Sequence, residues 1–101
     1  MLTSKEKRRL RQVAHHLQPV VTIAERGVTD GLLEETRRAL SDHEIIKAKV
    51  NVSDRGIRRE LGEALAAQCD SEIVQVIGKV WVLYRANSDA DPRLSNVARF
   101  S

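Results

Sequence analysis

The sequence has little of what marks several specialised protein classes. Its only cysteine, Cys69, excludes an internal disulfide, and no other Cys or His lies near it at metal-ligand spacing. We therefore expect Cys69 to be a buried thiol. No apolar run approaches the roughly 18 residues that span a bilayer, and the first twenty residues lack the apolar core of a secretory signal. These absences predict a soluble, cytoplasmic protein without a membrane partner.

Aromatic residues make up 3% of the chain. Proteins that bind single-stranded nucleic acids often stack bases on exposed rings, and so few rings argue against a wide stacking platform. Trp81 and Tyr84 lie in an apolar run, where packing in the core is the simpler role. Any nucleic-acid contact should then depend mainly on charge and on backbone groups.

Catalytic signatures are also missing. The chain has no Walker sequence, complete dinucleotide-binding glycine set, nucleophile elbow or HExxH motif. His15 and His16 are adjacent on an expected helix and so point about 100° apart, which excludes a shared metal. We expect His15 and His43 to end helices. The sequence predicts no enzyme, no catalytic residue, no metal site and no cofactor.

Charge is unevenly distributed over the 101 residues. The net charge is +3, yet the first twenty residues hold five basic side chains against Glu6 alone, and the remainder is slightly acidic. Such a cluster is the electrostatic footprint of a protein that binds nucleic acid or another anionic surface. A solvated helix face is the alternative. The candidate phosphate contacts in this cluster are Lys5, Lys7, Arg8, Arg9 and Arg11.

The expected helices follow from apolar periodicity and capping residues. Residues 4–17 form an amphipathic pattern with Ser4 or Thr3 as the N-cap, and Pro19 stops it. Thr29 caps a second helix that ends near Asp42 or His43. Ser53 or Asp54 caps a third helix, whose expected buried stripe is Ile57, Leu61, Ala64, Leu65 and Gln68.

The expected strands are residues 20–23, 44–52, 72–77 and 80–85. In the second, apolar residues alternate with Lys47 and Lys49, which predicts one apolar and one basic face. Gly78 and Lys79 separate the last two strands and suit a type II′ hairpin turn.

This order, αβαβαββ, predicts an α/β fold in which three helices pack on a mixed four-stranded sheet. Because the last strand is apolar on both sides, we expect helices to cover both faces of the sheet. The first helix is the candidate to cover the second face. We expect one domain over residues 1–85. Residues 86–101 lack periodicity and predict a flexible tail.

A second candidate contact is the loop after the first strand, which contains Arg26 and Gly27. Glycine lets a backbone segment approach closely, and the following helix N-terminus offers free N–H groups to phosphate. An ordinary strand-to-helix turn is the alternative, and Asp30 opposes an anion there. Further candidates for nucleic-acid contact are Lys47, Lys49, Lys79 and Arg85.

Three stretches together resemble the CRM domain (chloroplast RNA splicing and ribosome maturation), specifically its stand-alone bacterial YhbY-type members. They are VAHHLQPVVTIAERGVT at 13–29, HEIIKAKV at 43–50 and VQVIGKVWVLYR at 74–85, and the resemblance covers about residues 3–85. It implies a fold similar to the C-terminal domain of bacterial translation initiation factor 3. It also implies association with ribosomal RNA in precursor large ribosomal subunits and a role in ribosome assembly.

The family resemblance also implies a GxxG loop, likened to the RNA-clamping loop of KH domains. Here the loop reads Ala24, Glu25, Arg26, Gly27, so alanine replaces the first glycine and an acid follows it. Arg26 and Gly27 keep the family pattern. The resulting hypothesis is a monomeric, non-enzymatic RNA-binding protein. The alternative is a protein-interaction adaptor whose basic helix docks on an acidic partner, with RNA contact incidental.

Overall fold

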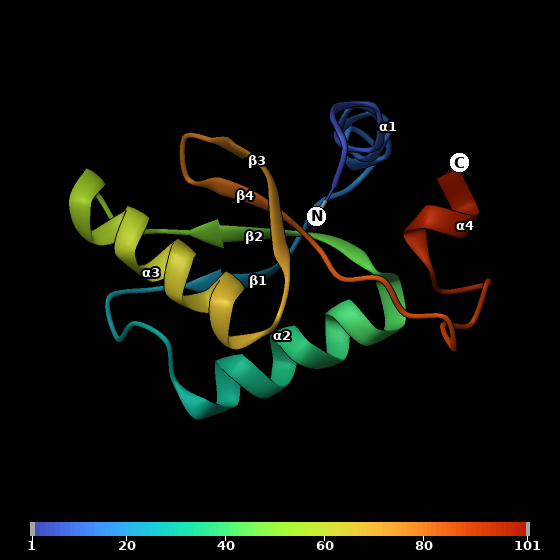
Figure 1. The fold of residues 1–101 in the computed structure, drawn as a ribbon. Helices are drawn as coiled ribbons and strands as arrows, with labels where there is room; N and C mark the ends of the chain where they lie inside the picture. Colours follow the sequence, from blue (N-terminus) through green and yellow to red (C-terminus); the bar gives the residue numbers. More distant parts are fainter. Residues whose placement is uncertain (1, 101) are drawn as a thin grey trace.

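The computed structural model describes residues 2–100, in which helices and strands follow the order αβαβαββα (Figure 1). The helices are α1 (Ser4–Ala14), α2 (Asp30–His43), α3 (Arg55–Gln68) and α4 (Asn96–Phe100). The strands are β1 (Pro19–Ile23), β2 (Ile45–Val50), β3 (Glu72–Ile77) and β4 (Val80–Tyr84). None of the helices in this part of the chain is long and apolar enough to cross a membrane.

The four strands form one mixed sheet in the order β1-β2-β4-β3. β1 and β2 are parallel and are connected through α2, whereas β4 is antiparallel to both β2 and β3. The predicted mixed four-stranded α/β fold is therefore confirmed. β3 contains a bulge between Ile73 and Gln75, and Gln75 pairs with Val82 of β4. Because of this extra residue, Val74 and Gln75 both lie toward the α1 face of the sheet.

Helices cover the two faces of the sheet unequally (Figure 1). α2 and α3 pack over one face and bury the larger core, whose fully enclosed members include Ile23, Leu40, Val50, Leu65 and Leu83. α1 lies on the opposite face, where Leu10, Val13, Ala14 and Leu17 meet Ile45, Val74 and Val82. This confirms that the first helix covers the second face. It covers only the end of that face where β2 begins, and Lys49 and Ile77, toward the β3–β4 turn, remain exposed.

The three long helices begin at the predicted N-caps. The side chains of Thr3, Thr29 and Asp54 accept backbone N–H groups three residues on, and Glu6 completes a capping box with Thr3. α1 ends at Ala14, three residues before the predicted end. The N–H groups of His16 and Leu17 bond carbonyls three residues back, which tightens the chain out of the α-helix while Leu17 stays buried.

The predicted buried stripe of α3 is wrong in part. Ile57 is 50% exposed and Gln68 is exposed, whereas Gly62, Leu65 and Ala66 are buried against the sheet. A glycine gives no hydrophobic signal, yet Gly62 is what lets the helix approach the ring of Trp81. The helix is therefore rotated relative to the face that hydrophobicity alone selects.

The β3–β4 turn agrees with the predicted hairpin. Gly78 has a φ of 58° and Lys79 is not left-handed, which is the pattern of a type II′ turn. The turn also contacts the end of β2, because the Val50 N–H donates to the Lys79 carbonyl at 2.7 Å.

The C-terminal segment differs from the expected flexible tail. It folds back along α1 and ends in α4 (Figure 1). Ser95 is 1% exposed and donates to the Glu44 carboxylate, while buried Asn96 donates to the Ile45 carbonyl at 2.9 Å. Val97 and Phe100 pack at the margin of the α1 core. These polar anchors, and not an apolar period, hold the segment in place.

Candidate nucleic-acid interface

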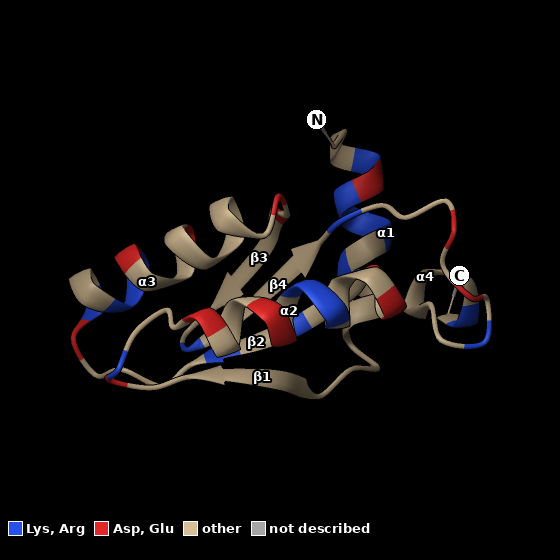
Figure 2. Ribbon diagram, turned by 90° about the horizontal axis from the view of Figure 1, so that it is seen from below, with Lys and Arg blue, Asp and Glu red and all other residues tan. Residues whose placement is uncertain are grey.

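The cations of α1 divide between two flanks of the helix. Lys7, Arg11 and His15 are spaced four residues apart and so lie along one flank, and His15 contacts the open part of the sheet. Lys5 and Arg9 lie toward the opposite flank, which they share with His16. The cations appear as blue bands on α1 in Figure 2.

α4 occupies the side of α1 that carries His16. The His16 ring stacks on Phe100 with 4.9 Å between centroids and 5° between planes, and the Arg99 guanidinium lies 5.2 Å from the Phe100 centroid. The Lys7 and Arg11 side chains are half-buried along the other flank, while Lys5, Arg8 and Arg9 are exposed. The two flanks therefore present equal numbers of lysines and arginines in different surroundings.

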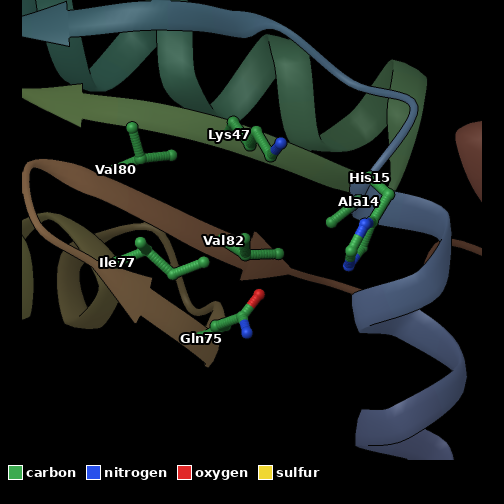
Figure 3. A pocket seen from close by; sticks show the side chains of 7 residues that line it. All are labelled: Ala14, His15, Lys47, Gln75, Ile77, Val80 and Val82. Atoms are coloured by element: carbon green, nitrogen blue, oxygen red, sulfur yellow. The ribbon is translucent and has the colours of Figure 1, made fainter.

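A groove of about 300 Å³ separates the end of α1 from the uncovered part of the sheet (Figure 3). His15 lies on its α1 side, and the strands supply the floor. Among the described residues that line it, none is acidic. The floor residues are Lys47, Gln75, Ile77, Val80 and Val82.

Lys47 and Lys49 lie on this same face of β2, as the alternation predicted. Lys47 is half-buried, and its Nζ donates to the Leu17 carbonyl at 3.2 Å, which fixes the ammonium group next to the groove. Lys49 lies two residues further along β2 and is exposed. Lys47 is the lysine that lines the groove, and Lys7 and Arg11 lie on the same flank of α1 as His15.

The Gly27 loop forms a second, separate region. The Gly27 N–H donates to the Ala24 carbonyl at 2.9 Å, which closes a tight turn over residues 24–27. Gly27 has a φ of 77°, a conformation that favours glycine, and a Cβ there would lie 3.4 Å from the Leu61 side chain of α3. Glu25 and Arg26 are both exposed at the turn. The loop thus offers one cation and one acid to an approaching anion.

Sequence reasoning overlooked the cations beside this loop. Arg55, Arg58 and Arg59 occupy the first turns of α3, next to the β1–α2 loop in Figure 2. Arg58 donates to the Val52 carbonyl at 3.5 Å, and Arg59 forms an exposed ion pair with Glu63 at 2.8 Å. The local run RGIRR was the available signal. Lys79 lies at the same end of the molecule, where its Nζ donates to Asn51 at 3.3 Å.

Arg85 lies away from both regions and has a structural environment. Its guanidinium donates to the Cys69 carbonyl at 3.1 Å, to the Arg37 carbonyl at 3.1 Å and to the Ser41 hydroxyl at 2.7 Å. These bonds join the end of β4 to α2 and to the end of α3. The structure therefore does not bring Arg85 together with the other predicted contacts.

The thiol of Cys69, the phenol of Tyr84 and the imidazoles of His15 and His43 are further groups that could take part in chemistry. Cys69 is 1% exposed, as predicted, and burial raises the pKa of its thiol. Burial also raises the pKa of Tyr84. His15 is the C-cap of α1, and the His43 Nδ1 lies 2.8 Å from the Leu94 carbonyl in the C-terminal segment. Within residues 2–100, no cluster of three metal-ligating side chains occurs.

The fold and the two separate cationic regions describe a small mixed α/β binding domain. Comparison with known proteins identifies the family to which it belongs. Residues 2–85 match the family model of the CRS1 / YhbY (CRM) domain. The chain belongs to this family, as the sequence resemblance predicted.

Proteins similar to this chain are named as RNA-binding proteins. A probable RNA-binding protein of Pseudomonas aeruginosa is 45% identical over 100 residues, covering 99% of this chain and 96% of that protein. A probable RNA-binding protein of Bacillus subtilis is 37% identical over 89 residues, covering 88% and 93%. The solution structure of a Staphylococcus aureus protein, described as a candidate RNA-binding protein, matches with a TM-score of 0.76 and 35% identity, covering 90% of this chain and 95% of that one.

Proposed function

We propose that this protein binds RNA as a non-catalytic factor and that α1 with the adjoining sheet face is its main contact surface. The observation that carries the proposal is a groove lined by Lys47 and His15 with no acid in its described lining, beside the α1 flank that carries Lys7 and Arg11. Phosphate groups supply most of the affinity in such contacts, since cations that neutralise them release condensed counterions. Lys5, Arg8 and Arg9 add exposed charge around this surface.

The RNA that we propose is ribosomal RNA in precursor large ribosomal subunits, where the protein assists assembly. Membership of the CRM family and relatives named as RNA-binding proteins support RNA as the ligand class. The resemblance to YhbY-type members supports the ribosomal target. The proposal includes a cytoplasmic location and a monomeric protein.

The Gly27 loop is the proposed secondary contact. Arg26 and the neighbouring α3 arginines attract phosphate, whereas Glu25 repels it. Because the loop lacks the first glycine of the GxxG pattern, we rank it below α1.

Salt titration of RNA binding tests the proposal. Neutralising about four phosphates predicts that log affinity falls against log salt with a slope of about −2 to −4. Charge reversal at Arg8 and Arg9 should weaken binding to unrelated RNA sequences alike, because phosphate contacts carry little base information. A flat salt response would contradict RNA binding through α1.

A pull-down with and without nuclease separates RNA from protein as the primary ligand. If precursor large subunits are the target, their proteins should be recovered only while the RNA is intact. Partners retained after nuclease treatment would instead identify an adaptor that docks through the basic helix.

A further inference from the structure

We infer that the groove between α1 and the open face of the sheet holds a base of single-stranded RNA. The inference rests on the proposed function and specifies which part of the RNA this surface recognises. The groove of about 300 Å³ is at the lower end of ligand-site volumes, which run from roughly 300 to 1,000 Å³. That size suits one flat ring system better than an extended chain.

The apolar part of the groove floor is open to solvent at Ile77 and Val80, whereas Val82 is 1% exposed and belongs to the core beneath α1. Val80 and Val82 of β4 lie beside Ile77 of β3 in Figure 3, and Ile77 is 63% exposed. Every described lining residue on β4 is a valine. A base laid against Ile77 and Val80 removes apolar surface from water on both partners, which favours binding.

Two polar side chains at the groove have the chemistry to recognise a base. His15 presents an imidazole ring from the end of α1, and histidine rings stack on unpaired bases in RNA-binding proteins. The amide of Gln75 offers both a donor and an acceptor, which suits the edge of a base. The β3 bulge is responsible for this position, because it turns Gln75 to the same face as Val82.

The charges around the groove select the occupant. Lys47 and Lys49 lie on the sheet side, and Lys7 and Arg11 lead along α1 to His15. A base seated on Ile77 and Val80 leaves its phosphates within the field of these cations, with no acid in the described lining to repel them. An unpaired nucleotide matches both the apolar floor and the cationic rim, whereas the bases of a duplex are stacked and unavailable.

The test compares two probes with the same number of phosphates, a uridine decamer and an abasic ribose-phosphate decamer. Fluorescence anisotropy should give an affinity for the uridine decamer at least about fivefold higher, the lower bound for one stacked base. His15→Ala should remove most of this preference by lowering the affinity for the uridine decamer more than the affinity for the abasic chain.

Neighbouring residues on β3 supply a matched control. Ile77 lies in the groove and is 63% exposed, while Val76 lies on the other face and is 47% exposed. Ile77→Ser should reduce the preference for the uridine decamer, and Val76→Ser should not. Both positions are exposed, so thermal unfolding should verify that each variant folds.

Methyl NMR provides a readout that does not depend on affinity. Signals of Val80 and Ile77 should shift with the uridine decamer and stay in place with the abasic chain. Equal affinity for the two probes would overturn the base site and leave RNA binding intact, whereas failure of both probes to bind would overturn the proposed function as well. Shifts of the same methyl signals produced by a polyglutamate peptide alone would assign the groove to a protein and overturn the inference.

Discussion

The indole of Trp81 lies directly on Gly62, so that a Cβ atom at position 62 would be only 2.5 Å from the ring. The contact joins the middle of α3 to the central strand β4. The ring is 4% exposed, and its Nε1 is a buried donor without a hydrogen-bond partner. Trp81 is therefore held by packing in the larger core, in which its ring lies against the backbone of Gly62.

In Gly62→Ala the added methyl group overpacks the contact, which by itself costs about 1–3 kcal/mol in the free energy of unfolding. This loss should outweigh the gain of about 1 kcal/mol that alanine has over glycine inside a helix. Gly31→Ala in α2 is the control, since a Cβ there meets nothing within 4 Å. Urea unfolding should show the first variant destabilised and the second unchanged or slightly stabilised.

The two flanks of α1 predict unequal effects from equal changes in charge. Lys7→Ala with Arg11→Ala removes the cations that lead to the groove, whereas Lys5→Ala with Arg9→Ala removes one lysine and one arginine from the other flank. The loss of Lys7 and Arg11 should weaken binding of single-stranded RNA more than the loss of Lys5 and Arg9. The expected loss of affinity for the Lys7 and Arg11 pair is about tenfold, if each cation contributes roughly 0.7 kcal/mol. Anisotropy at one salt concentration measures both. Equal losses would mean that α1 acts only through its total charge.

Arg85→Ala should destabilise the protein by about 1–3 kcal/mol, because three hydrogen bonds between β4, α2 and the end of α3 are lost. Lys79→Ala is a suitable control, since Lys79 makes a single exposed bond to Asn51. Chemical denaturation measures stability. RNA binding measured well below the unfolding temperature then tests the sequence-based prediction that Arg85 also contacts RNA.

Deleting residues 86–101 should destabilise the protein by about 2–4 kcal/mol. The deletion uncovers the apolar margin beneath Val97 and Phe100 and leaves the Ile45 carbonyl without its bond from Asn96. Leu94→Ala, a change at a side chain 43% exposed, should alter stability by less than about 0.5 kcal/mol. An unchanged unfolding midpoint after the deletion would agree with a flexible tail instead.

Glu6 should make the stability of α1 dependent on pH. The Thr3 backbone N–H, and then its side chain, lower the pKa of the Glu6 carboxyl from the ordinary value of 4.5. A lowered folded-state pKa stabilises the fold above the unfolded value, and the effect is lost as the pH falls through the folded value. Glu6→Gln should thus reduce stability at neutral pH and converge with the parent as the pH falls below the lowered folded-state pKa of Glu6. Glu60→Gln, at an exposed position on α3, should track the parent throughout.

The features that could be predicted from the sequence depend on residues that lie close together along the chain. Thr3, Thr29 and Asp54 cap helices through residues three positions away, and strand alternation identified the basic face of β2. These signals depend on short-range geometry and so survive without knowledge of the fold. The count of charges in the first twenty residues likewise identified the α1 cations.

What could not be predicted depends on contacts between distant segments. The orientation of α3 is set by Gly62 meeting Trp81, and the C-terminal segment is held by Ser95 and Asn96 bonding to groups near residue 45. Neither the contact of Gly62 with Trp81 nor the packing of the C-terminal segment is marked by a periodic pattern of apolar residues. The groove required knowledge of where α1 crosses the sheet, and it brought in His15 and Gln75, which the charge pattern did not select.

The bulge in β3 also affects how the molecule meets other copies of itself. β3 is an edge strand, and edge strands expose backbone groups on which another chain can extend the sheet. An extra residue between Ile73 and Gln75 breaks the regular spacing of those groups. Strand addition from a second molecule would meet an interrupted ladder, so the same irregularity that turns Gln75 into the groove protects this edge from aggregation.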